Sequence, residues 1–113
     1  MTTTDYRMVE ARNQTIFREM NEWTREDEAT RFHGARIGDV YLCECGDGNC
    51  TAPIVLTPGE YEAVRSEPTR FAIALDHENP EIDAVVIEYA GYTVVAKMFG
   101  PAARMARASD PRR

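Results

Sequence analysis

All three cysteines of the chain, Cys43, Cys45 and Cys50, lie within eight consecutive residues. Residues 39–45, DVYLCEC, predict a strand, on which Cys43 and Cys45 project from the same face. The next residues, GDGN at 46–49, predict a turn that returns Cys50 to that face. The spacing therefore predicts a hairpin that gathers three sulfur atoms within a few ångströms of one another.

A histidine is expected to complete this cluster, because a structural zinc site takes four tetrahedral ligands from cysteine thiolate and histidine imidazole. The chain has two histidines, His33 and His77. His77 lies in a polar loop after a predicted strand that can pair beside the cysteine hairpin, whereas His33 precedes Gly34 at a predicted helix end. The loop position favours His77, and His33 is the alternative. The predicted ligands are Cys43, Cys45, Cys50 and His77.

The same cysteines are compatible with other chemistry. Cys45 and Cys50 can form a disulfide, or all three can be unliganded thiols with Cys43 in the core. A stable disulfide is disfavoured in a reducing compartment, and an iron–sulfur cluster normally takes four cysteines. An enzyme with Cys45 or Cys50 as nucleophile and His77 as base is a further alternative. We favour zinc in a structural role, because four protein ligands close its coordination sphere.

The composition indicates one globular domain, residues 1–113, with 43% hydrophobic and 28% charged residues. No apolar run approaches the roughly 20 residues that span a bilayer, and the N-terminus lacks the pattern of a secretory signal. We therefore expect a cytoplasmic protein without membrane association. The net charge of −6 argues against nucleic-acid binding.

Residues 4–32 predict one long amphipathic helix. Its apolar stripe is made of Tyr6, Val9, Ile16, Met20 and Trp23, with Phe17 beside them. Asn13 falls on the same stripe, at a position where a coiled coil can carry a polar residue that fixes register. We expect the stripe to pack on the domain's own core. The alternative is a homodimer seam through Asn13 and Trp23, although the repeat decays after Trp23.

The remaining segments predict short strands and one short helix. Thr57, Pro58 and Glu60 match a capping box, and Pro68 ends the helix that it starts. The predicted strands are 39–45, 53–56, 70–75, 85–89 and 92–98, with a helix at 82–89 as the competing interpretation. The fold class is α+β: a long N-terminal helix plus a small, mainly antiparallel sheet of about five strands, stapled by a Cys3His zinc site. Residues 39–99 form this core, and residues 100–113 are expected to be a flexible, Arg-rich tail.

No catalytic motif is found in the sequence, which has no Gly-rich phosphate loop, no G-x-S-x-G and no H-E-x-x-H. We expect a non-enzymatic zinc-binding regulatory or adaptor protein that acts through contacts with a protein partner. Arg65 and Arg70 are candidates for a partner-binding patch, or else for surface ion pairs with Glu62 and Glu67. The alternative function is a redox- or zinc-responsive sensor that uses the same cysteines.

The chain also resembles a family of small, mostly actinobacterial proteins of uncharacterised function. The matching segments are FREMNEW, LCECGDGNCTAPIVLTPGEYEAVRSEPTRF and DHENPEIDAVVIEYAGYTVVAKMFGPAA. The cysteines together with EYEAVR and PTRF are the specific part of the match. The resemblance implies a site made of Cys43, Cys45, Cys50 and His77, and it implies no activity. In the family a glycine usually precedes the histidine, whereas Asp76 does so here.

Overall fold

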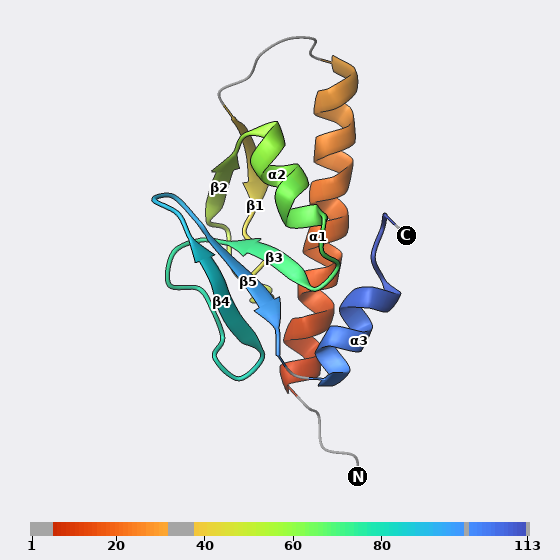
Figure 1. The fold of residues 1–113 in the computed structure, drawn as a ribbon, viewed down its shortest axis with the longest axis vertical. Helices are drawn as coiled ribbons and strands as arrows, with labels where there is room; N and C mark the ends of the chain where they lie inside the picture. Colours follow the sequence, from red (N-terminus) through yellow and green to blue (C-terminus); the bar gives the residue numbers. More distant parts are fainter. Residues whose placement is uncertain (1–5, 32–37, 99, 113) are drawn as a thin grey trace.

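Three helices and two small antiparallel sheets make up the described part of the computed structural model, residues 6–31, 38–98 and 100–112. The helices are α1 (Tyr6–Arg31), α2 (Pro58–Arg65) and α3 (Gly100–Ala108). The strands are β1 (Asp39–Leu42), β2 (Pro53–Leu56), β3 (Arg70–Ile73), β4 (Asp83–Glu88) and β5 (Thr93–Lys97). Figure 1 shows α1 standing along one side of the molecule. The prediction of a mixed fold with a long N-terminal helix and antiparallel strands is confirmed, and β4 excludes the competing helix at 82–89.

The strands form two sheets rather than the single sheet that the sequence predicts. All of β1 pairs with β2, and β5 lies between β3 and β4 in the second sheet. After Leu42 the chain leaves β1: the Cys43 N–H donates to Ala52 O at 3.3 Å, and the Glu44 N–H donates to Ala72 O at 2.9 Å. The cysteine segment therefore bridges the two sheets instead of continuing the strand to residue 45.

The apolar core lies between the sheets and α2. Its largest fully buried apolar side chains are Tyr61, Phe71, Ile54, Leu56, Ile73 and Val95. The predicted capping box starts α2, since Thr57 Oγ1 accepts from the Glu60 N–H and Glu60 Oε1 accepts from the Thr57 N–H. This start directs Tyr61 into the core, where its ring stacks on Tyr41 with centroids 4.5 Å apart. Burying a large apolar side chain of this kind stabilises the fold by about 1.5–3 kcal/mol.

α1 turns a polar face toward the rest of the fold, so the prediction that its apolar stripe packs on the core is wrong. Among the α1 side chains that the structure describes, those of Ala11, Gln14, Arg18, Asn21 and Glu22 are buried. Val9, Ile16, Met20 and Trp23 are 44%, 42%, 41% and 62% exposed. Most of the buried polar groups have partners: Arg18 Nη2 donates to Ala106 O at 2.8 Å, and its guanidinium lies over the Phe71 ring, 4.9 Å from the centroid. Gln14 Oε1 and Arg18 Nε are buried without a hydrogen-bond partner in the described part of the chain. Hydrogen bonding of this kind offsets the cost of taking polar groups out of water.

The described part of α1 covers most of the predicted helix. It runs from Tyr6 to Arg31. The predicted ends at residues 4 and 32, Gly34 and the side chain of Tyr6 lie outside what the structure describes. At 1.5 Å per residue, its 26 residues extend over about 39 Å. Neither α1 nor any other described helix is both long and apolar enough to cross a membrane.

The C-terminal segment forms a third helix, and the prediction of a flexible tail is wrong for α3. Ala102, Ala103 and Ala106 are buried, and α3 packs against α1. Small side chains at these positions let the two helices approach closely. Beyond the helix, Arg112 Nε donates to Glu22 Oε1 at 2.9 Å, and Arg112 also pairs with Glu62. Alanine packing and these ion pairs together hold the segment in place.

Candidate metal centre

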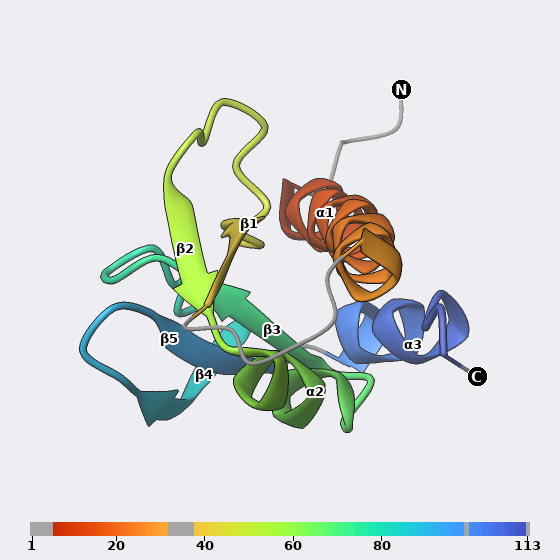
Figure 2. The same cartoon turned by 90° about the horizontal axis from the view of Figure 1, so that it is seen from above.

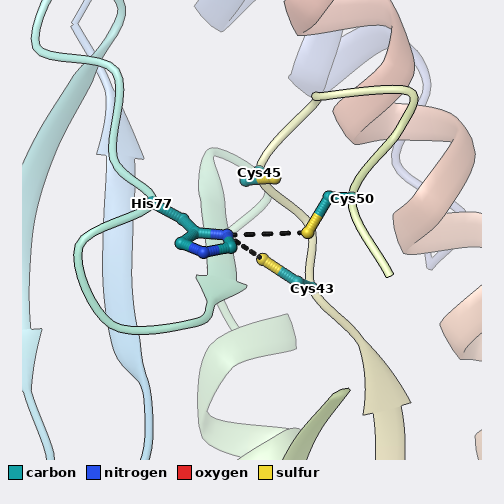
Figure 3. Close-up of side chains that lie close together, drawn as sticks. All are labelled: Cys43, Cys45, Cys50 and His77. Atoms are coloured by element: carbon teal, nitrogen blue, oxygen red, sulfur yellow. Dashed lines mark hydrogen bonds between the residues drawn. The ribbon is translucent and has the colours of Figure 1, made fainter. Parts of the chain in front are cut away.

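The four predicted ligands meet where the cysteine segment passes between the two sheets. Cys43 and Cys45 follow β1, Cys50 precedes β2, and His77 lies in the loop after β3. One ligand atom from each lies within 4.8 Å of all the others. Figure 3 shows the His77 ring directed at the sulfur atoms of Cys43 and Cys50, with Nδ1 3.5 Å from each. The predicted set is therefore brought together, while His33 lies outside the described residues.

Two of the six separations between ligand atoms match the edge of a tetrahedral metal site. Bonds of about 2.3 Å to sulfur and about 2.05 Å to nitrogen place the two ligand atoms about 3.6 Å apart. The two measured sulfur–nitrogen distances are both 3.5 Å. All three cysteines are free thiols in this arrangement, so the disulfide alternative is not what the structure contains. These four side chains can hold one metal ion.

The loop at residues 46–49 fits tightly against α1 through Gly46. This glycine has φ +85°, in the left-handed region that only glycine enters without a steric penalty. A Cβ on Gly46 would lie 2.5 Å from Glu10 O and 2.9 Å from Gln14 Cγ. Asn13 Nδ2 donates to Gly46 O at 3.0 Å. The glycine thus permits both the turn between Cys45 and Cys50 and the approach of α1.

Replacing Gly46 with alanine is expected to lower the free energy of unfolding by about 2–3 kcal/mol, because the new Cβ meets both a disfavoured backbone conformation and a backbone oxygen. Gly48→Ala is the matched control in the same loop, since the nearest atom to its Cβ would be Asn13 Nδ2 at 3.9 Å. Urea unfolding of the two variants measures the difference. Equal stability of both variants would contradict this account of the loop.

The loop that carries His77 is shaped by a left-handed residue and by bonds to the cysteine segment. Asp76 has φ 64°, the one described non-glycine residue with positive φ. Aspartate tolerates this region better than most residues, and glycine tolerates it freely. The Ala74 N–H donates to Cys43 Sγ at 3.1 Å, which anchors the loop beside the site.

The neighbouring thiols of Cys43 and Cys45 shift each other's pKa in opposite directions. A hydrogen bond from Cys43 lowers the pKa of Cys45 to about 5, with the Asp47 N–H and His77 adding to the effect. The same contact, together with burial, raises the pKa of Cys43. Three adjacent thiolates are stable together only beside a cation, so metal binding has to displace protons. The affinity for a metal is therefore expected to fall as the pH is lowered.

Glu44 lies between two of the ligands and points to the opposite side of the chain, into the core. Its carboxylate is fully buried and accepts from Arg65 Nη2 at 2.6 Å and Arg65 Nη1 at 3.1 Å. It also accepts from Asn21 Nδ2 at 2.7 Å and from the Ala72 N–H at 2.9 Å. Glu44 was not among the predicted site residues, although strand alternation places it opposite Cys43 and Cys45. Glu44 therefore links the cysteine segment to α1, α2 and β3 through hydrogen bonds.

Arg65 is part of this buried pair, so its predicted place in a surface patch is wrong. Its side chain is 2% exposed, and the ion pairs expected with Glu62 or Glu67 are replaced by the pair with Glu44. The buried carboxylate raises the pKa of Arg65 against the opposing effect of burial. Arg70 is half-buried at the start of β3, and its role in partner binding stays a prediction.

The other two predicted partner-binding residues lie on α1. The side chain of Asn13 is half-buried, and its amide is already paired with Gly46 O inside the chain. Trp23 is exposed and borders a surface pocket of about 460 Å³ that Glu22, Glu62 and Arg112 also line. Trp23 is therefore available for contact with another molecule.

Gln14 links the cysteine segment to a second buried ion pair. Gln14 Nε2 donates to Cys45 O at 3.3 Å and lies 3.5 Å from Asp83 Oδ2. Lys97, the single lysine of the chain, donates from Nζ to Asp83 Oδ1 at 2.6 Å, with both side chains buried. Burial lowers the pKa of Lys97, and the charge of Asp83 opposes that shift. The polar face of α1 thus contacts the chain on both sides of the candidate metal centre.

No family model matches the chain, and no curated protein or solved structure gives a significant match. What this centre does is therefore inferred from its geometry and its ligand chemistry.

Proposed function

We propose that the protein is a non-enzymatic, zinc-binding regulatory or adaptor protein that acts through contacts with another protein. The observation that carries the proposal is the set of three sulfur atoms and one imidazole nitrogen within 4.8 Å of one another. Zinc prefers this ligand set and a tetrahedral arrangement, whereas calcium and magnesium prefer oxygen. Four protein ligands leave no coordination position for water or substrate, which favours a structural role.

Zinc bound here would tie three separate segments of the chain together. Cys43 and Cys45 lie in the segment that bridges the sheets, Cys50 begins the return to β2, and His77 belongs to the loop after β3. The segment at 42–46 also holds α1, because three α1 side chains bond to its backbone. These side chains are Asn13, Gln14 and Asn21. The metal would therefore support the position of α1, whose apolar side chains face outward.

A redox- or zinc-responsive sensor is the second candidate, because one side of the site is open. Cys50 is half-buried and His77 is exposed, and both are within reach of small oxidants. His77 also borders a shallow pocket of about 410 Å³. Hydrogen peroxide would take one electron from each of two thiolates, such as those of Cys45 and Cys50, to form their disulfide. Two protons and the peroxide would yield two water molecules, and zinc would be released.

Titration of the zinc form with hydrogen peroxide separates the two candidates, with released zinc and remaining thiols followed together. For an adaptor with a structural metal, we expect zinc to stay bound at low oxidant concentrations, because the ligated thiolates are protected. Release of zinc with the loss of two thiols per metal, reversed by a thiol reductant, would favour the sensor. Protein that holds no zinc before the titration would refute the adaptor with a structural zinc and the zinc-responsive sensor, leaving only a redox sensor with free thiols.

A further inference from the structure

The outer face of α1 carries an apolar stripe, here called the α1 seam, made of Val9, Ile16, Met20 and Trp23. Figure 2 looks along α1 and places it at the rim of the molecule, with α3 on one side and β1 on the other. All four side chains are at least 41% exposed. A large exposed apolar stripe of this kind is typical of an interaction surface.

The α1 seam has the spacing of a coiled coil. Val9, Ile16 and Trp23 are spaced seven residues apart and occupy the d position of a heptad repeat. Asn13 and Met20 occupy the a position of the same repeat. The opposite side of the helix is the one that the fold buries, through Gln14, Arg18, Asn21 and Glu22. These polar groups are hydrogen-bonded to the rest of the fold. A rotation of α1 that buried the seam would therefore break their hydrogen bonds.

We propose that the α1 seam is covered by a second copy of this chain in an antiparallel helix pair. This inference rests on the proposed adaptor function and names its partner. In the register that best matches apolar residues, Val9 lies against Met20 of the second copy and Asn13 against its Ile16. Trp23 then packs on the first turn of the opposing helix. Buried tryptophan is a frequent anchor of protein interfaces.

The charges that flank the seam favour a second copy in this orientation. Arg12 and Glu19 are both exposed at the heptad g position beside the seam. In an antiparallel helix pair the g positions of the two helices face each other. Arg12 of each copy therefore lies opposite Glu19 of the other copy, and the two-fold axis generates this contact twice. A parallel pair would instead place Arg12 beside Phe17 of the other copy, and the two Asn13 residues beside each other. A parallel pair is disfavoured because the Asn13 amide already donates to Gly46 O and is not free to pair with a second Asn13.

Sedimentation equilibrium of the zinc-loaded protein tests the inference. We expect a species of twice the chain mass of 12.8 kDa across the micromolar range. Ile16→Glu should raise the dissociation constant of this dimer by about 100-fold, because it places a charge in the apolar layer of each helix. Val85→Glu is the matched control, since Val85 is 44% exposed on β4, a strand that does not flank α1 (Figure 2). A dimer that Ile16→Glu leaves intact would overturn the proposal.

A charge exchange tests the register. Arg12→Glu should weaken the dimer by about 10-fold, because each new glutamate faces Glu19 of the other copy. Adding Glu19→Arg to the same chain should restore the wild-type dissociation constant. Failure of the double variant to recover would overturn the antiparallel register proposed here.

Zinc measured on the same samples separates this inference from the proposed function. A protein that holds zinc but sediments as a monomer would overturn the dimer and leave the zinc-binding role standing. A dimer that holds no zinc would overturn the zinc-binding role and leave the α1 seam standing.

Discussion

Exchanging His77 for alanine is expected to release the metal and to lower the thermal midpoint of unfolding by about 15–25 °C. His77 is the one ligand that comes from the loop after β3, so its loss removes the metal-mediated link between that loop and the cysteine segment. A metal present at about a thousand times its dissociation constant adds about 4 kcal/mol to the free energy of unfolding. In a domain of this size, that loss corresponds to the expected fall in midpoint.

Two further histidine variants make this prediction specific to the metal. His77→Cys supplies a fourth sulfur ligand and should retain zinc and most of the stability, because zinc accepts four thiolates as readily as three thiolates and an imidazole. His33→Ala removes the other histidine of the chain and should behave as wild type. Differential scanning calorimetry with and without a chelator measures all three variants. If His77→Ala keeps its metal while His33→Ala loses it, the ligand assignment is wrong.

Replacing Glu44 with glutamine is expected to lower the free energy of unfolding by about 3–5 kcal/mol, because it leaves the Arg65 charge buried without a counter-charge. The pair is fully enclosed, with side chains 0% and 2% exposed. The glutamine amide also places a donor where Asn21 Nδ2 or the Ala72 N–H donates now. Urea unfolding monitored by circular dichroism gives the difference in free energy directly.

Glu62→Gln is the control for this prediction, because Glu62 also pairs with arginines but its side chain is 44% exposed. Its removal should cost no more than about 1 kcal/mol. The double variant Glu44→Leu with Arg65→Met should recover part of the loss, since it removes the uncompensated charge but leaves the Asn21 amide and the Ala72 N–H without the Glu44 acceptor. A Glu44→Gln variant as stable as Glu62→Gln would mean that the buried pair does not hold the cysteine segment.

Sequence alone could predict the cysteine part of the centre because the relevant rules are local. Alternation along an extended segment places Cys43 and Cys45 on one side, and a short turn returns Cys50. The capping box of α2 is equally local and is confirmed. His77 lies 27 residues beyond Cys50, and it could be predicted only because a tetrahedral zinc site takes four ligands and the chain has one other histidine.

The orientation of α1 could not be predicted in the same way. Periodicity shows which residues share a helix face, but not which face a fold buries when polar partners are available. Here Asn21 and Arg18 find partners in the cysteine segment and in α3, and the apolar stripe is left outside. The prediction that Arg65 lies in a surface patch is wrong for a related reason. Arg65 lies four residues after Tyr61 and therefore shares its inward face of the helix. On that face Glu44 supplies the opposite charge.

The C-terminal helix and the division into two sheets could not be predicted from sequence, because both depend on contacts between segments that are distant in the chain. The Gly-Pro break before residue 102 and the many arginines suggested flexibility, but three alanines at positions 102, 103 and 106 form a face that packs on α1. The cysteine segment joins the two sheets, because Cys43 bonds to Ala52, next to β2, and Glu44 bonds to Ala72, within β3. No local pattern in the cysteine segment indicates this bridge.

The ratio of zinc to chain in protein purified under reducing conditions, without added metal, tests the central claim most directly. Elemental analysis should give one zinc per chain for the wild type and a large loss for Cys45→Ser, whose hydroxyl is a poor zinc ligand. Folded, stable wild-type protein with far less than one zinc per chain would contradict the claim that the cysteine cluster is a structural zinc site.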